Sequence, residues 1–384
     1  MFGQLLGFNA NHASLTVQAI LDGTVDSFKF FVKTASLNPI VYERYWKSLG
    51  QFYKEHVFYT RLVKDLQKFV DKKITADCYL SKLNDTIVLE DLADLGYETS
   101  KLRNLDMQHA ELAIESLANL HAASLLYEEK TGISICDKYE DVMYESLVFV
   151  DKERPTEHVL FSVDRSMRTL GDKYFQHVKP DDRSWLFTQI HKTVDRSVND
   201  RSSRYRRVVC QGDPWGNNIL YKYSKDGRPE EAILVDFGCH RFVPPALELM
   251  QFIYLALTSD FRARHKSEII HRYYAKLGDI LAENGVSIDA VLPRKEFLES
   301  CDAFEEFGLS IRVYYTYFTQ LPGDFLLKAA SSVDSFLGLM TLGNAELATE
   351  AFEADDQYRA LLTESVEEAF RHFSRRIYPA GVPT

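Results

Sequence analysis

The sequence predicts an α+β protein, with a small N-terminal sheet lobe over residues 1–92 and a large, mostly helical lobe over residues 93–384. Two observations lead to this division. Short runs rich in apolar and β-branched residues, separated by turn signals, gather in the first ninety residues together with one main helix. Beyond them, apolar residues recur at helical spacing over most of the chain, interrupted by one short hairpin.

The composition is that of an acidic globular chain. Its 384 residues carry 45 basic and 56 acidic side chains, a net charge of −11, and 46% are apolar. This charge argues against nucleic acid or an anionic membrane as a partner, so we expect neither. The five cysteines form no CxxC pair, which is typical of free thiols in a reducing compartment. No charged-then-apolar leader opens the sequence, and we therefore expect a cytoplasmic protein.

The sheet lobe is expected to begin with a hairpin. Residues 14–21 and 27–35 are rich in apolar and β-branched side chains, and a turn signal, DGTVD, lies between them. Residues 41–70 are helical in character, and residues 85–92 form an apolar strand that ends in acids. One face of the predicted helix carries residues at the spacing i, i+4, i+7 and i+11, namely Phe52, His56, Tyr59 and Val63.

The helical lobe is expected to begin with a long helix over residues 105–130, with Asp106 as its N-cap. His121 lies on the apolar face of this helix, so we interpret it as a core histidine that supports a loop rather than as a catalyst. Residues 139–200 are charged and helix-like, and an Asp226-Gly227 turn predicts a hairpin further on. Helix boundaries in the remainder are expected at four prolines: Pro244, Pro245, Pro293 and Pro322.

Two acidic segments point to chemistry on a phosphate. RRVVCQGDPWGNNILYKY (206–223) places Asp213 five residues before Asn218, and AILVDFGCHR (232–241) places Asp236 at the end of an apolar run. Phosphoryl transfer needs an acid that accepts the proton of the attacking hydroxyl, and oxygen ligands for Mg²⁺. Protein kinases space the base and a metal-binding asparagine in the same way. We therefore predict Asp213 as the base, and Asn218 and Asp236 as ligands of Mg²⁺ and nucleotide.

The matching basic group is expected on an early strand. Lys33 in FFVKT would contact the α- and β-phosphates of ATP, and Glu55 in FYKEHVFY would orient it. The backbone at Glu90 and Leu92, in VLEDL, would face adenine. Each residue alone also fits an edge strand, a solvated helix or a turn. Their order along the chain favours a bilobal, protein-kinase-like fold. Phosphate loops of the GxxxxGK[ST] and GxGxxG types and the hydrolase motifs HExxH and GxSxG are absent from the sequence.

Longer blocks carry a family resemblance. GDPWGNNILYKY and ILVDFGCHRFVPPALELMQFIYLAL, with HASLTVQAIL and LANLHAAS, resemble the ecdysteroid kinase-like family of arthropods, which is related to choline and aminoglycoside kinases. The resemblance runs from about residue 11 to past residue 280. It implies a small-molecule kinase that uses ATP and Mg²⁺ to phosphorylate a hydroxyl, with ecdysteroids or xenobiotic alcohols as acceptors and roles in steroid hormone metabolism or detoxification.

The sequence departs from the family pattern at three points. Gln211 stands where the family usually has histidine, Gly238 where it often has glutamine, and Glu248 where it usually has aspartate. The segment expected to cover the phosphates, residues 7–14, is also poor in glycine. A catalytically weak or silent kinase-like binding protein therefore stays open as an alternative, as does a kinase of the choline or aminoglycoside type.

The acceptor site is expected in the helical lobe, beside the base. An aromatic stretch there contributes three candidates for lining an apolar pocket, Tyr314, Tyr315 and Phe318. The same residues could equally form the core of a helix, and the sequence leaves both interpretations open.

Overall fold

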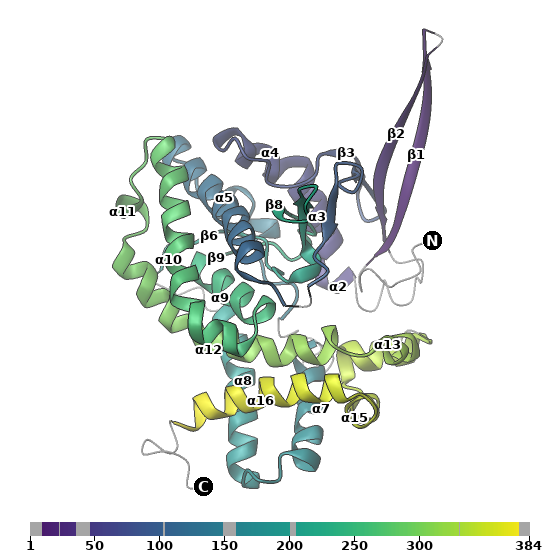
Figure 1. Cartoon of the computed structure of the whole chain (residues 1–384), viewed down its shortest axis with the longest axis vertical. Helices are drawn as coiled ribbons and strands as arrows, with labels where there is room; N and C mark the ends of the chain where they lie inside the picture. Colours follow the sequence, from purple (N-terminus) through teal and green to yellow (C-terminus); the bar gives the residue numbers. More distant parts are fainter. Residues whose placement is uncertain are drawn as a thin grey trace. The chain divides into compact units, whose positions relative to one another are not determined.

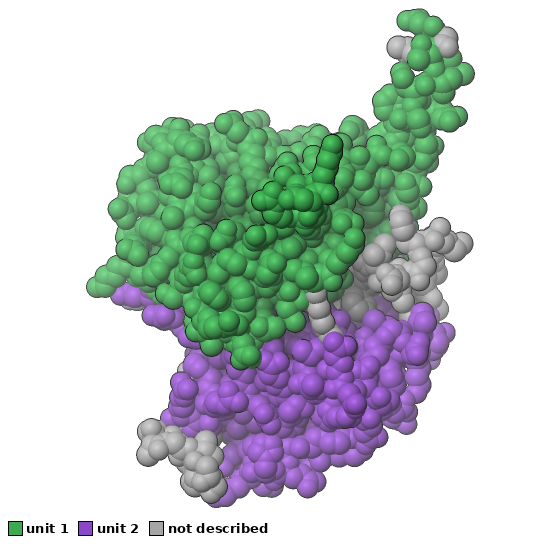
Figure 2. All heavy atoms as spheres, in the orientation of Figure 1, with its two compact units in different colours: residues 1–146, 205–252, 256–298 green, residues 147–204, 253–255, 299–384 purple. Residues whose placement is uncertain are grey.

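The structure, a computed structural model, describes residues 10–22, 24–35, 47–102, 104–148, 159–199, 205–329 and 331–375. It confirms the predicted α+β class, with an antiparallel sheet near the N-terminus and a mostly helical remainder (Figure 1). The chain forms two compact units (Figure 2). Unit 1 comprises residues 1–146, 205–252 and 256–298, and unit 2 comprises residues 147–204, 253–255 and 299–384. The lobe boundary predicted after residue 92 lies inside unit 1 and stays a prediction.

The N-terminal sheet has the strand order β1-β2-β4-β3, from β1 (Asn11–Leu21), β2 (Thr24–Thr34), β3 (Cys78–Lys82) and β4 (Thr86–Glu90). The predicted hairpin is present, and its strands are longer than the apolar runs suggested. In β2, only residues 30–34 pair with β4. The outer part of the β1–β2 hairpin therefore extends beyond the sheet (Figure 1). Its register places His12 directly opposite Lys33.

The helix predicted over residues 41–70 is segmented. Residues 41–46 lie outside the described residues, and the rest forms α2 (Lys47–Leu49), α3 (Gln51–Val57), a π-helical turn (Phe58–Leu62), α4 (Val63–Leu66) and a 3₁₀ turn (Gln67–Phe69). Gly50 separates α2 from α3 with a left-handed φ of 64°. Of the four residues predicted to share one face, Tyr59 is buried, whereas Phe52, His56 and Val63 are only half-buried. The buried residues of α3 are Gln51, Lys54, Glu55 and Val57, so polar contacts join apolar packing in fixing its orientation.

The rest of unit 1 surrounds the predicted long helix, α5 (Met107–Thr131). Its N-cap is Asp106 as expected, since the carboxylate accepts the backbone N–H of His109 at 3.1 Å. Two small sheets follow, β5-β7-β8 and β6-β9. Their strands are β5 (Tyr97–Thr99), β6 (Val208–Cys210), β7 (Ile219–Tyr223), β8 (Pro229–Leu234) and β9 (Arg241–Val243). The helices are α6 (Ile135–Lys138), α9 (Pro245–Ala256), α10 (Ser259–Glu283) and α11 (Ile288–Val291), with a 3₁₀ turn at Glu140–Val142.

The described residues of unit 2 form helices and the loops that connect them. It contains α7 (Val159–Tyr174), α8 (Pro180–Asn199), most of α12 (Arg294–Thr319), α13 (Gly323–Ala329), α14 (Val333–Leu337), a π-helical turn (Gly338–Leu342), α15 (Ala345–Ala354) and α16 (Asp356–Ser374). Buried hydroxyls link these helices, as where Tyr317 donates to Ser166 at 3.0 Å and Tyr358 donates to the Tyr317 carbonyl at 3.1 Å. Within the described ranges no single helix has the length and apolarity to cross a membrane; the bent pair Gly323–Ala329 and Val333–Leu342 passes that test only when taken together.

Candidate functional site

Lys33 lies between two carboxylates. Its Nζ is 2.7 Å from Oε2 of Glu55 on α3 and 3.0 Å from Oδ1 of Asp236, in the loop that follows β8. Lys33 and Glu55 are 5% and 2% exposed, whereas the Asp236 side chain keeps 37% of its surface open. The predicted ion pair between Lys33 and Glu55 is present. Asp236, the acid predicted to bind metal, forms an ion pair with the same ammonium group.

Burial and charge oppose each other at Lys33 and Asp236. Burial disfavours the ammonium, but the carboxylates of Asp236 and Glu55 more than offset this and raise the pKa of Lys33. Burial likewise disfavours the Asp236 carboxylate, but the nearby ammonium outweighs it and holds the pKa of Asp236 below its usual value. Both groups are therefore charged at neutral pH, as the binding of phosphate and of a metal ion requires.

Asp213 is held by its own loop, which connects β6 to β7. Its Oδ2 accepts a hydrogen bond from Nε1 of Trp215 at 3.2 Å and from Nδ2 of Asn218 at 2.8 Å. The same Asn218 nitrogen also donates to the Asp213 backbone carbonyl at 3.0 Å. The tryptophan and the asparagine thus fix the direction of the carboxylate. This accounts for the DPWGNN spacing noted in the sequence.

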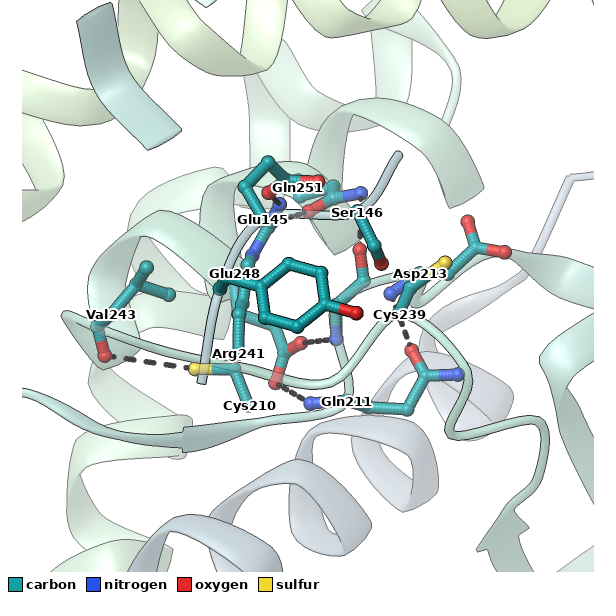
Figure 3. Close-up of polar contacts among 12 residues, drawn as sticks. Glu145, Ser146, Cys210, Gln211, Asp213, Cys239, Arg241, Val243, Glu248 and Gln251 are labelled. Carbon is teal, nitrogen blue, oxygen red and sulfur yellow. Dashed lines mark hydrogen bonds and ion pairs between the residues drawn. The ribbon is translucent and has the colours of Figure 1, made fainter. Parts of the chain in front are cut away.

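Gln211 braces the two acidic loops against each other. Its Oε1 accepts the Asp213 backbone N–H at 2.7 Å (Figure 3). Its Nε2 donates to the carbonyls of Val235 and Asp236, each at 2.9 Å. The side chain is fully buried. A neutral amide therefore uses donor and acceptor together here. Gln211 thus holds the loop in this chain, where the family resemblance implies a histidine.

Glu248, in α9, supports the same turn. Its carboxylate accepts the backbone N–H groups of Gln211 at 3.2 Å and Gly212 at 2.6 Å (Figure 3). His121 of α5 contacts Glu248 at 2.7 Å through Nε2 and Tyr273 at 2.5 Å through Nδ1. His121 is fully buried, so the prediction of a core histidine that supports the loop is confirmed.

The side chains of His121, Cys210 and Glu248 offer ligand atoms within 4.8 Å of one another. They do not fit a metal ion, because the Glu248 oxygens already accept two backbone N–H groups and the His121 nitrogens contact Glu248 and Tyr273. We assign this cluster to the support of the base loop.

The two acidic loops approach each other at a glycine. Gly212 has a φ of 89°, and a Cβ at this position would lie 1.9 Å from the Cys239 carbonyl oxygen. Asp236 itself adopts a left-handed φ of 59°, which is uncommon for a residue other than glycine and clusters at functional sites. Phe237 then stacks on Phe58, with ring centroids 3.8 Å apart. Close packing therefore fixes the backbone that presents Asp236.

The residues predicted to hold Mg²⁺ fit that ion by their donor chemistry. Hard divalent cations take oxygen ligands from carboxylates and amides. Asp236 supplies a carboxylate. Asn218 turns its nitrogen towards Asp213, which directs its amide oxygen the other way. The assignment of both residues to the metal stays a prediction.

The other predicted residues lie on the expected elements. Glu90 ends β4 and donates its N–H to the Asp77 carbonyl at 2.8 Å, while the Leu92 carbonyl accepts from Leu95 and Tyr97. In unit 2, Tyr314, Tyr315 and Phe318 lie on α12. Tyr314 is 3% exposed, and its hydroxyl lies 3.1 Å from Nδ1 of His191, whereas Tyr315 and Phe318 are half-buried. Their predicted role in an acceptor pocket is untested.

Sequence reasoning included His12 only as part of residues 7–14, the segment expected to cover the phosphates, and did not single it out; the structure places it in β1. It faces the same side of the sheet as Lys33, because the two are direct cross-strand partners. Burial is the main cause that lowers the pKa of His12, and the positive charge of Lys33 lowers it further. The alternation of β1 could have placed His12 on that side, but only the register shows which residue it faces.

Comparison with known proteins places the chain in one family. The sequence pattern of the ecdysteroid kinase-like family matches residues 11–286. No curated protein matches the chain in sequence.

Several solved structures resemble the chain distantly. An ethanolamine kinase from Plasmodium vivax is 11% identical, with a TM-score of 0.42 over 90% of this chain and 83% of its own. A choline kinase from Cryptosporidium parvum is 9% identical, with a TM-score of 0.43 over 93% and 91%. A choline kinase from Streptococcus pneumoniae is 11% identical, with a TM-score of 0.38 over 94% of both chains. All three TM-scores are low, so these likenesses carry no argument about the activity of this chain.

Proposed function

The chain belongs to the ecdysteroid kinase-like family of kinase-like phosphotransferases, and from this premise we propose that it transfers the γ-phosphate of ATP to a hydroxyl of a small molecule. One observation carries the proposal. Lys33, Glu55 and Asp236, which come from three separate elements, meet within 3.0 Å at a buried ammonium. Asp213 stands on a loop that Gln211 joins to the loop of Asp236.

The nucleotide side of the site follows from these contacts. Lys33 steadies the α- and β-phosphates, and Glu55 keeps its ammonium in place. His12 lies on the same side of the hairpin and adds a ring N–H donor for a phosphate oxygen. Since the Glu90 N–H and the Leu92 carbonyl already have backbone partners, we assign the Glu90 carbonyl and the Leu92 N–H to adenine.

The transfer side uses three oxygen-bearing residues. Asp213 accepts the proton of the acceptor hydroxyl as the new O–P bond forms and the bond from the γ-phosphorus to the bridging oxygen breaks, releasing ADP. Trp215 and Asn218 hold its carboxylate in position. Asp236 and the Asn218 amide oxygen hold Mg²⁺, which when bound neutralises charge on the phosphates.

We propose an apolar alcohol, such as an ecdysteroid or a xenobiotic alcohol, as the acceptor. A molecule of this kind presents a large apolar body and one reactive hydroxyl, and its pocket should be mostly apolar with few polar groups. Tyr314, Tyr315 and Phe318 are our candidates for lining it. The family description supports a steroid acceptor, and we place the reaction in the cytoplasm.

The test is a transfer assay with purified protein, Mg²⁺-ATP and a panel of alcohols, read by mass spectrometry. We expect a phosphorylated alcohol with the wild-type protein and none above background with Asp213→Asn. If nucleotide binds but no alcohol gains a phosphate, the chain is a silent binding protein and the proposal is wrong.

A further inference from the structure

Lys54 is a buried lysine beside the ion pair that the reaction uses. It precedes Glu55 on α3 and is fully buried. Its Nζ donates to the Tyr144 carbonyl at 2.5 Å, approaches the Ser146 hydroxyl at 3.4 Å and lies 4.5 Å above the Tyr144 ring. A buried ammonium is costly to desolvate, and each of these contacts offsets part of that cost.

The segment that receives Lys54 also contacts the loop of Asp236. The Ser146 hydroxyl donates to the Gly238 carbonyl at 3.3 Å, and Gln51, one turn before Lys54, donates to Sγ of Cys239 at 3.3 Å. The helix that carries Glu55 and the residues directly after Asp236 are thus joined through two neighbouring routes, both buried.

Glu145 extends this connection to the base loop (Figure 3). It forms a buried ion pair with Arg241 at 2.6 Å, and the other Arg241 nitrogen donates to Gln251 at 2.5 Å. Gln251 in turn donates to the Gly212 carbonyl at 3.2 Å, one residue before Asp213. Residues 144–146, which we call the strap, therefore contact the helix of Glu55, the loop of Asp236 and a side chain that reaches the loop of Asp213.

We propose that Lys54 is a positioning residue, which anchors α3 to the strap so that Glu55, Asp236 and Asp213 are held in one arrangement. This rests on the proposed kinase function. The reason is geometric. Three of the four buried residues of α3 are polar, and Lys54 is the one whose charged group donates to the strap. Without it α3 keeps its helical hydrogen bonds but loses its register against Asp236.

The kinetic test is a pair of matched substitutions. Lys54→Met keeps the length and removes the ammonium, and Lys64→Met makes the same change at an exposed position of α4. Misplacement by roughly 1 Å costs about 10²-fold in rate. We expect kcat/KM for ATP to fall about 10- to 100-fold in Lys54→Met and to stay within about twofold in Lys64→Met.

A double-mutant cycle separates positioning from general stability. If Lys54 acts through Glu55, adding Lys54→Met to Glu55→Gln should lower kcat/KM by less than about threefold, because coupled residues are not additive. Ser146→Thr, which keeps the strap hydroxyl, should retain more activity than Ser146→Ala. Full additivity of Lys54→Met and Glu55→Gln would overturn the proposal.

Hydrogen exchange keeps the inference testable if the wild-type protein proves inactive, a result that would count against the proposed function alone. In Lys54→Met we expect faster amide exchange both in residues 51–57 and in residues 237–241, and unchanged exchange in Lys64→Met. Exchange that speeds up in α3 alone would show that the strap does not join the two segments.

Discussion

The same substitution, Asp→Asn, should have different effects at Asp213 and at Asp236. Asp213→Asn keeps the contacts to Trp215 and Asn218 in shape but removes the base, so turnover should fall by about 10²–10⁴ with nucleotide affinity nearly unchanged. Asp236→Asn should instead lose Mg²⁺-dependent nucleotide binding. Steady-state kinetics and titration with a fluorescent ATP analogue measure both effects. Full turnover in Asp213→Asn would contradict its assignment.

Gln211 allows a stability prediction with a size-matched control. Gln211→Ala leaves three backbone groups without their partner, and a buried unpaired group costs about 1–3 kcal/mol. Gln211→His should be tolerated better, because imidazole supplies one donor and one acceptor. Gln211→Glu has the size of the amide but loses both donors to the Val235 and Asp236 carbonyls. Thermal unfolding that is as high in Gln211→Glu as in the wild type would refute the bracing role.

His240 predicts how the free energy of unfolding changes with pH. It is fully buried, and its Nδ1 donates to the Phe237 carbonyl at 2.7 Å. Burial, and then the positive charge of Lys54, lower the pKa of His240 from its ordinary value of 6.5 to about 3. The unfolded chain therefore binds a proton that the folded chain does not between these values. The free energy of unfolding should fall as pH drops below about 6.5, by about 1.4 kcal/mol per unit at most.

The measurement for His240 is the difference between two proteins. Unfolding at about pH 7 and about pH 5 should show a larger acid loss in the wild type than in His240→Gln, which has no group that titrates in this range. Equal losses in the two proteins would mean that His240 does not carry the effect.

The ion pair of Lys33 with Glu55 could be predicted from the sequence because both residues follow known spacing on recognisable elements. The roles assigned to Asp213, Asn218 and Asp236 stay predictions. The contacts of Lys54 and His12 could not be predicted in this way. The Lys54 partner, Tyr144, is 90 residues away, and the His12 neighbour depends on the register of a hairpin. Contacts at such separations follow from the folded structure and leave no periodic signal in the sequence.

At the level of elements, Gly50 decides where α3 begins. Its φ of 64° suits glycine, and a Cβ there would lie 2.0 Å from the Tyr144 hydroxyl oxygen. Gly132, which ends α5 with a φ of 67°, has no atom within 4 Å of such a Cβ. Gly132→Ala should therefore show the left-handed strain alone, about 1–2 kcal/mol.

Gly50→Ala adds a displacement of Tyr144 to the same strain, and Tyr144 belongs to the strap. We expect it to lower the melting temperature more than Gly132→Ala does, and to raise the KM for ATP, which Gly132→Ala should leave unchanged. Identical effects on both quantities would show that α3 does not depend on its contact with Tyr144.

The helix of Glu55 shows why an element can be predicted and its packing missed. The spacing of Phe52, His56, Tyr59 and Val63 predicted one face, but only Tyr59 of these is buried, and α3 buries Gln51, Lys54, Glu55 and Val57. Periodicity assumes that apolar burial orients a helix. Here hydrogen bonds and an ion pair also orient the helix. Periodicity alone misses such a face, because three of the four buried residues of α3 are polar.

At the scale of the whole molecule, the α+β class and the order of elements followed from turn signals and periodicity, while the compact units did not. Unit 1 and unit 2 each combine distant stretches of the chain, so no single sequence boundary separates them. The candidate acceptor residues lie in unit 2, and Asp213, the candidate base, lies in unit 1.

The most direct measurement is a competition between acceptors. The wild-type protein is incubated with Mg²⁺-ATP and equal amounts of ecdysone and choline, and each molecule is examined by mass spectrometry for an added phosphate, with Asp213→Asn as the control. We expect phosphorylated ecdysone from the wild type and none from the variant. Phosphocholine as the sole product would contradict the apolar acceptor, and ATP binding without any phosphorylated product from these or other alcohols would contradict the kinase itself.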